Sequence, residues 1–218
     1  MTEAHASQAA DGILKIRLSD FPALQEPFGS IRFGPNRIGS DEFPEGDIYP
    51  LIITRDEIGV FYAMDAQCKH NSCTVPPFST DTFSIHCPCH GSNYAIDGTV
   101  FSNQPATDSL TPYEITYDGE DTLTIVVQKF GFCINGRPAP TANGDRFRIE
   151  FPTYPVTRYA VMFRRTAEEE WTQALVALTP DGPVDTWNIV GTGGPATAYV
   201  PRNTGTGFYA VQMLMSEV

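Results

Sequence analysis

The segments Cys68-Lys69-His70-Asn71-Ser72-Cys73 and Cys87-Pro88-Cys89-His90-Gly91-Ser92 decide the fold of this chain, and sixteen residues lie between His70 and Cys87. Each segment offers one thiolate and one imidazole, in the patterns C-x-H and C-x-x-H. Two Cys and two His in this order can hold a two-iron cluster, with the thiolates on one iron and the imidazoles on the other. Imidazole ligands are neutral, so the iron that they bind accepts an electron more readily than iron in an all-cysteine cluster. The pattern therefore indicates one-electron transfer.

The surrounding residues resemble the Rieske iron–sulfur proteins over roughly residues 11–133, and specifically the high-potential branch found in cytochrome bc-type complexes. The resemblance implies a 2Fe-2S cluster with four ligands: Cys68, His70, Cys87 and His90. It also implies a disulfide between Cys73 and Cys89, a hydrogen bond from Ser92 to a bridging sulfide, and one from Tyr94 to a ligand sulfur. Rieske domains of ring-hydroxylating dioxygenases lack the extra cysteines and usually have Trp after His-Gly, so Ser92 disfavours that branch.

A Cys2His2 zinc site is the competing interpretation of the same four residues. Zinc fingers pair Cys with Cys and His with His along the chain, whereas each segment here pairs Cys with His. Two departures from the family pattern affect the surface of the site. Asn71-Ser72 replaces the apolar Leu-Gly that respiratory complexes dock onto cytochrome b, and Gln104-Pro105-Ala106 replaces a Gly-Pro-Ala loop.

The site residues predict two redox properties. Hydrogen bonds from Ser92 and Tyr94 to sulfur stabilise the reduced cluster, which predicts a potential in the upper half of the range of roughly −150 to +300 mV. Each imidazole binds through one nitrogen and leaves the other to carry a proton. Since reduction makes that proton less acidic, we expect a midpoint potential that falls as the pH rises.

Composition indicates an all-β protein with many turns. The chain of 218 residues has 18 Gly and 18 Pro, with short runs rich in Val, Ile, Thr, Tyr and Phe. The net charge of −12 argues against nucleic acid and anionic membrane surfaces as partners. This charge is compatible with a basic redox partner such as a class I cytochrome c, although solubility alone also accounts for it.

Five cysteines are an odd number, which leaves Cys133 alone in an apolar stretch, where we expect a buried inert thiol. A disulfide is typical of an oxidising compartment, so we expect a location outside the cytoplasm. Residues 1–7 show no signal peptide, and no stretch approaches twenty apolar residues. We therefore expect that a native signal or anchor has been removed, with a natively soluble protein as the alternative.

Strand-like runs continue along the whole chain. Before Cys133 we expect strands at 13–18, 48–55, 60–65, 83–86, 94–96, 99–101, 113–117 and 122–127, with a long loop at 20–46. After it we expect strands at 146–151, 159–164, 171–177, 185–190, 196–200 and 208–213. This second pattern looks like a fibronectin type III-like β-sandwich with Trp171 in its core. The expected division is a disordered lead-in at 1–11, a Rieske antiparallel β domain with a cluster-binding subdomain at 12–133, a linker at 134–144 and the sandwich at 145–218.

Three electron-transfer roles stay open at this point. The chain is a carrier between redox proteins, the Rieske subunit of a quinol-oxidising cytochrome bc-type complex, or the small subunit of an enzyme such as arsenite oxidase. Its redox partner is then a cytochrome c or a cytochrome b-type protein, and the polar Asn71 favours the carrier. A structural or adhesive module with a vestigial cluster is the alternative of another class. The oligomeric state is left open.

Overall fold

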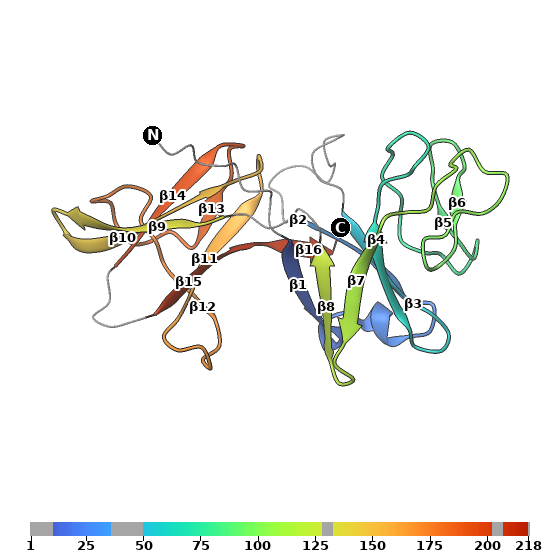
Figure 1. Cartoon of the computed structure of the whole chain (residues 1–218), viewed down its shortest axis with the longest axis horizontal. Helices are drawn as coiled ribbons and strands as arrows, with labels where there is room; N and C mark the ends of the chain where they lie inside the picture. The colour runs from blue at the N-terminus through green and yellow to red at the C-terminus, as the bar shows by residue number, and fades with distance from the viewer. Residues whose placement is uncertain (1–10, 36–49, 128–132, 202–206, 218) are drawn as a thin grey trace, which may run out of the picture. The chain divides into compact units, whose positions relative to one another are not determined.

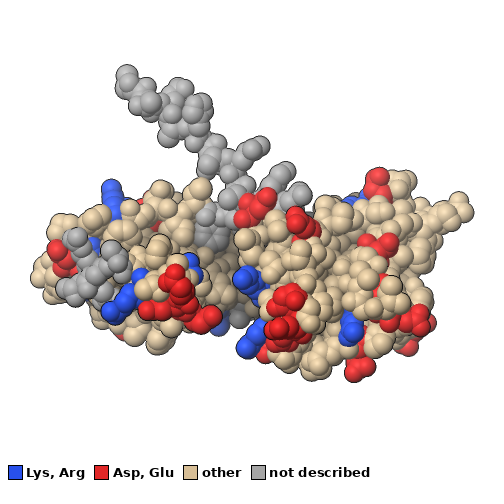
Figure 2. Space-filling model, turned by 60° about the horizontal axis from the view of Figure 1, so that its bottom comes forward, with Lys and Arg blue, Asp and Glu red and all other residues tan. Residues whose placement is uncertain are grey.

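The computed structural model describes residues 11–35, 50–127, 133–201 and 207–217, and these residues are nearly all β (Figure 1). They form two compact units. The first contains residues 11–34, 50–127 and 216–217, and the second contains Pro35, 133–201 and 207–215. Most of the expected lead-in, residues 1–10, lies outside the described residues. Figure 2 shows carboxylates and basic groups interspersed over wide uncharged areas, as the modest 18% of charged residues leads one to expect.

The first unit is built on a seven-stranded sheet in the order β1-β8-β7-β4-β3-β2-β16, antiparallel from β1 through β2. The strands are β1 (Gly12–Arg17), β2 (Ser30–Pro35), β3 (Leu51–Arg55), β4 (Phe61–Asp65), β7 (Pro112–Tyr117), β8 (Thr122–Val127) and β16 (Met215–Glu217). Alternation sets one face inward, since Leu123, Ile125 and Val127 of β8 are buried while their neighbours are partly exposed.

The hairpin of β7 and β8 forms where the sequence predicts it. The carboxylate of Asp118 accepts N–H groups from Glu120 at 2.9 Å and Thr122 at 3.0 Å, which closes the turn. These bonds, rather than burial, hold the pKa of Asp118 below its ordinary value.

The predicted loop at 20–46 is wrong in part, because β2 lies within it. Two 3-10 turns precede that strand, η1 (Leu18–Asp20) and η2 (Pro22–Gln25), while residues 36–49 lie outside the described part. Leu24 of η2 is fully buried, which ties this segment to the core. Among the described residues, no helix has both the length and the apolar character needed to cross a membrane.

A smaller subdomain lies between β4 and β7 and contains the two-stranded sheet of β5 (Ile85–His86) and β6 (Asn93–Tyr94). The strands expected at 94–96 and 99–101 form only in part, since β6 ends at Tyr94 and Tyr94 pairs with Val100 in an isolated bridge. The chain does turn between them: Ala95 donates its N–H to the carbonyl of Thr99, and Gly98 donates to the carbonyl of Ala95. The subdomain shares one continuous core with the sheet. Its buried residues are Ile52, Met64, Ala66, Cys68, Val75, Phe78, Ile85, Cys87, Tyr94, Ala106 and Leu110.

The second unit contains two sheets. One has the order β14-β10-β9, and in the other β11 pairs with β12, β13 and β15. The strands are β9 (Asn135–Thr141), β10 (Gly144–Pro152), β11 (Arg158–Arg164), β12 (Thr172–Gln173), β13 (Asn188–Val190), β14 (Pro195–Pro201) and β15 (Phe208–Met213). Phe151 and Tyr159, with ring centroids 5.5 Å apart, belong to its core. All six predicted strand segments contain a strand, although β12 and β13 are shorter than expected.

The predicted linker at 134–144 is wrong, because residues 135–141 form β9 and pair with β10. Pro138 lies opposite Phe147, and Pro140 lies opposite Asp145. Proline has no N–H to donate, so it is tolerated only on an edge strand at positions that do not donate to the neighbour. Because Pro138 and Pro140 are two residues apart and donor positions alternate along the strand, both prolines occupy positions that do not donate to β10. A composition typical of a turn is therefore accommodated in a strand.

Two side-chain predictions in this part of the chain are also wrong. Trp171 is 37% exposed and is no core anchor. The guanidinium of Arg164 instead lies over the Trp171 ring, with Cζ 4.4 Å from the ring centroid. Such a cation–π contact is favourable for an aromatic ring at the surface, because the face of the ring attracts the positive charge. Cys133, expected to be buried, is exposed.

Candidate metal centre

The two Cys/His segments form loops with the same backbone design. The N–H of Cys68 donates to the carbonyl of Cys73 at 2.8 Å, five residues further on. The N–H of Cys87 donates to the carbonyl of Ser92, also five residues on and also at 2.8 Å. The first loop follows β4 and the second follows β5, so each begins where a strand has ended.

Each loop then turns back on its first cysteine. Ser72 donates its N–H to the carbonyl of Cys68 at 2.9 Å, and Gly91 donates to Cys87 at 3.1 Å. Both donors have left-handed backbone, with φ of 54° at Ser72 and 79° at Gly91. Glycine adopts this conformation without strain, whereas Ser72 adopts it against the usual preference of an L residue.

The loops place the predicted thiol ligands and the predicted imidazole ligands in different surroundings. Cys68 and Cys87 are buried, with 1% and 0% of their surface exposed, and their thiols interact with each other. His70 and His90 are exposed, and their ring centroids lie 4.7 Å apart. The structure thus brings the two thiols together beneath the surface and the two imidazoles together at the surface.

The environment differentiates the two thiols. Burial raises the pKa of Cys68, but hydrogen bonds from Tyr94, the backbone and Ser92 outweigh burial and lower it overall. Burial and the hydrogen bond with Cys68 raise the pKa of Cys87.

Tyr94 and Ser92 lie as hydrogen-bond donors beside this pair. The hydroxyl of Tyr94 donates to Sγ of Cys68 at 3.3 Å. Burial, together with this contact, raises the pKa of Tyr94 strongly, so the hydroxyl keeps its proton. Oγ of Ser92 accepts the N–H of Ala106 at 3.0 Å, which orients the hydroxyl, and Ser92 forms a side-chain hydrogen bond to Cys68.

The predicted disulfide between Cys73 and Cys89 is confirmed, with Cα atoms 6.6 Å apart. It joins the first loop to the second. The sulfur atoms of Cys73, Cys87 and Cys89 all lie within 4.8 Å of one another, so the disulfide lies directly beside one of the buried thiols.

Two further side chains contact Asn93, the first residue of β6. His86, which is not one of the predicted ligands, is exposed, and its Nδ1 lies 2.8 Å from Oδ1 of Asn93. In the segment that replaces Gly-Pro-Ala, Oε1 of Gln104 accepts the N–H of Asn93 at 3.1 Å. Gln104 thus fastens this segment to β6.

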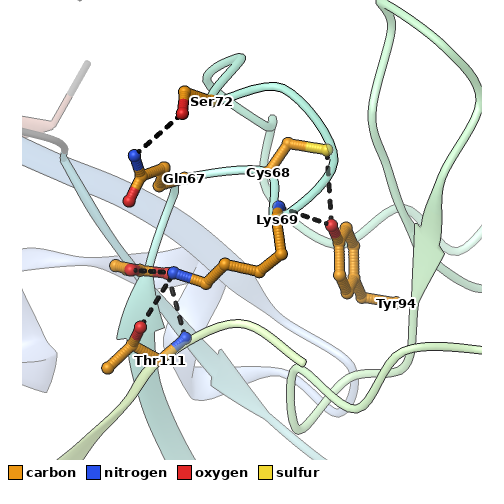
Figure 3. Close-up of polar contacts among 7 residues, drawn as sticks. Gln67, Cys68, Lys69, Ser72, Tyr94 and Thr111 are labelled. Atoms are coloured by element: carbon orange, nitrogen blue, oxygen red, sulfur yellow. Dashed lines mark hydrogen bonds and ion pairs between the residues drawn. The ribbon is translucent and has the colours of Figure 1, made fainter. Parts of the chain in front are cut away.

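Sequence reasoning missed Lys69, which lies between two predicted ligands. Its Nζ contacts Oδ2 of Asp65 at 2.6 Å and Oγ1 of Thr111 at 2.8 Å (Figure 3). The backbone N–H of Lys69 donates to the hydroxyl of Tyr94 at 3.0 Å. A lysine in a polar loop is usually solvated, and Thr111 is 42 residues away in sequence, so no local signal marks the contact with Thr111.

The donor set fits a two-iron cluster with mixed ligation. Such a cluster requires two thiolates and two imidazoles. The buried thiols and the adjacent exposed imidazoles supply this set, and hydrogen bonds stabilise the anionic form of one thiol. A structural zinc site places its four ligands around a single ion. Here the thiols and the imidazoles form two separate pairs, which suits two metals better than one.

Comparison with known proteins agrees with this chemistry. Residues 37–114 match the family model described as Rieske [2Fe-2S] domain. The ferredoxin subunit of 3-phenylpropionate/cinnamic acid dioxygenase from Shigella boydii is 29% identical over 86 residues, which cover 37% of this chain and 81% of the relative. Iron-sulfur subunit 2 of the cytochrome b6-f complex from Synechocystis is 32% identical over 81 residues, and the chloroplastic subunit from Volvox carteri is 34% identical over 81 residues.

The match covers 37% of this chain in both cytochrome b6-f comparisons, and 44% and 39% of those two relatives, so the chain spans less than half their length. Among solved structures, the plasma membrane Rieske protein of Synechocystis PCC 6803 is 25% identical with a TM-score of 0.36. That comparison covers 50% of this chain and 94% of the other. From the matched residues and the paired Cys/His loops, we conclude that this chain contains a Rieske [2Fe-2S] domain, whose cofactor is a two-iron, two-sulfur cluster.

Proposed function

We propose that the chain transfers single electrons through a cluster held by Cys68, His70, Cys87 and His90. The observation that carries this proposal is the arrangement of the two loops, which buries both thiols and exposes both imidazoles. The bound cluster supplies the one-electron redox chemistry. The residues of the chain keep water from the sulfur side and leave the imidazole side open to a partner.

The potential is proposed to lie in the high Rieske range, as in the cytochrome bc-type branch. The support is the hydrogen bond from Tyr94 to Cys68 and the side-chain hydrogen bond from Ser92. Both withdraw electron density from sulfur, which favours the reduced state. The disulfide between Cys73 and Cys89 adds a feature that the resemblance associates with the same branch.

His-linked proton coupling is part of the proposal. Each imidazole binds through one ring nitrogen and holds or releases a proton at the other. The exposure of His70 and His90 gives that second nitrogen access to solvent or to a partner. The coupled proton then moves at the surface rather than through the core.

The proposed partners are a cytochrome c or a cytochrome b-type protein, met outside the cytoplasm. The disulfide supports an oxidising compartment. A carrier role is favoured over a quinol-oxidising complex because Asn71, exposed and polar, is a poor match for an apolar docking surface. The ferredoxin subunit among the relatives, of which the match covers 81%, supports a carrier. The arsenite-oxidase-like subunit and the adhesive module are less favoured alternatives.

For the second unit, we propose a fibronectin type III-like β-sandwich that follows the Rieske domain. Its two sheets and the core around Phe151 and Tyr159 support a sandwich. The domain boundary is proposed near residue 133, because the described residues that follow β8, from residue 133 to residue 215, belong to the second unit.

Protein-film voltammetry from about pH 5 to about pH 11 tests the proposal across the range in which imidazoles titrate. We expect a reversible one-electron wave at high potential that becomes pH-dependent. A low, pH-independent wave would contradict the high-potential and proton-coupling proposals. Zinc in place of iron, with no wave, would contradict electron transfer itself.

A further inference from the structure

We propose that Lys69, through its ion pair with Asp65, is a positioning residue that sets the hydrogen bond from Tyr94 to Cys68 and thereby raises the cluster's potential. This inference rests on the proposed electron-transfer function. It concerns a residue that binds no metal and that lies between two residues proposed to do so.

The hydroxyl of Tyr94 is held at two successive residues of the first loop. It accepts the backbone N–H of Lys69 at 3.0 Å and donates to Sγ of Cys68 at 3.3 Å (Figure 3). The accepted bond fixes where the hydroxyl oxygen lies and polarises the O–H, which makes it a better donor to sulfur. The strength of the Tyr94–Cys68 contact therefore depends on where the peptide between Cys68 and Lys69 lies.

The side chain of Lys69 fixes that peptide to the sheet below. Its ammonium contacts Asp65, the last residue of β4, and Thr111, which immediately precedes β7. Asp65 and Thr111 are themselves joined twice: Asp65 donates its N–H to the carbonyl of Thr111 at 2.9 Å, and Thr111 donates its N–H to Oδ1 of Asp65 at 3.0 Å. The anchor is therefore a closed network on two neighbouring strands.

Burial makes this anchor stiffer than an ordinary surface ion pair. The side chains of Lys69 and Asp65 are only 18% and 11% exposed. The exposed pair of Arg17 and Asp20, by comparison, has 68% and 51% exposure. Exposed pairs contribute little, whereas breaking a largely buried pair leaves an uncompensated charge. The lysine side chain thus holds its own backbone in one place.

Position can be separated from charge because the pair is neutral as a whole. Replacing both partners, Lys69→Met with Asp65→Asn, removes the anchor and leaves the net charge near the cluster unchanged. Thr111→Val removes one contact of the ammonium without changing any charge, and keeps the N–H that Thr111 donates to Asp65. This second variant covers the case in which the double variant does not assemble.

The test is the midpoint potential of each variant, measured by film voltammetry with and without Tyr94→Phe. We expect the Lys69→Met/Asp65→Asn variant to shift the redox equilibrium towards the oxidised form by up to about tenfold, or about 59 mV for one electron. Thr111→Val should shift it in the same direction by less. Tyr94→Phe should lower the potential less in the double variant than in the unmodified protein, because the two changes act through one contact. Hydrogen exchange of the Lys69 amide should also become faster.

The matched control is Arg148→Met with Glu150→Gln, a partly exposed ion pair in the second unit, which should leave the potential unchanged. An unchanged potential in both Lys69→Met/Asp65→Asn and Thr111→Val overturns the inference. So does an equal effect of Tyr94→Phe in both backgrounds, which would mean that the anchor and the tyrosine act separately. A failure of the proposed function is distinguishable, because the unmodified protein would then show no one-electron wave.

Discussion

Replacing both disulfide cysteines, as Cys73→Ser with Cys89→Ser, should destabilise the first unit and leave the second unaffected. The bond links residues 16 apart in sequence. In the chain-entropy model, a link of this span removes about 10 cal/mol/K of entropy from the unfolded chain, or about 3 kcal/mol at 25 °C. Because the bond joins the two ligand loops, the loss should also shorten the lifetime of the bound cluster.

Urea denaturation followed by two probes tests this prediction. The chain has two tryptophans, Trp171 and Trp187, and both belong to the second unit, so their fluorescence reports that unit. Near-ultraviolet circular dichroism also follows the tyrosines of the first unit. The double variant should lower the free energy of unfolding of the first unit by about 3 kcal/mol. The single variant Cys133→Ser, which removes a thiol outside the bond, is the control.

A loss below about 0.5 kcal/mol in the first unit would refute the entropic reasoning, because ordinary surface substitutions change stability by as much. An equal shift of the tryptophan transition would show that the effect is not confined to the unit that contains the bond.

Three further outcomes are expected. Tyr94→Phe should lower the midpoint potential by tens of millivolts, as measured by voltammetry, because the hydrogen bond to the ligand sulfur is lost. Gly98→Ala should destabilise the first unit more than Gly119→Ala, as measured by urea denaturation. Both glycines have positive φ, at +83° and +85°, so the backbone strain of the two variants is similar. A Cβ at residue 98 would lie 2.8 Å from Sδ of Met64, whereas a Cβ at residue 119 would meet nothing within 4 Å. Equal losses would mean that backbone strain, at about 1–2 kcal/mol, is the whole effect. Burial raises the pKa of Tyr159 from 10.0 to about 12, so the folded state holds this proton more tightly than the unfolded chain; the stability that it contributes is intact below pH 10.0 and is lost as the pH rises towards about 12. Urea denaturation of the second unit at about pH 9 and about pH 11.5 should show this decline, and Tyr159→Phe should decline less.

The metal centre could be predicted from the sequence because its chemistry needs particular residue types at short spacing. Cys68 and His70 are two residues apart, and Cys87 and His90 are three residues apart. The sequence alone therefore shows that each loop supplies one thiol and one imidazole. The strands around it were predictable for a similar reason, since alternation along β8 is a local pattern.

Features that depend on distant partners were not predictable. Besides Asp65, the ammonium of Lys69 contacts Thr111, which is 42 residues away. Trp171 looks like a core residue by size, but Arg164 covers its ring at the surface. The residues of β9 have the composition of a turn, and only their pairing with β10 makes them a strand. In each case tertiary contacts decide the outcome and local preference does not.

The edge of the second unit has a consequence for how molecules of this protein meet. Among the described residues, β9 is the outer strand of its sheet, and Pro138 and Pro140 have no N–H to offer at its open side. A strand from another molecule that tried to extend the sheet would meet carbonyl acceptors without the alternating N–H donors that a ladder requires. Open strand edges are the usual templates for aggregation, and proline is one of the residues that blocks them. The two prolines that made this segment resemble a linker therefore hinder pairing of another strand with this edge.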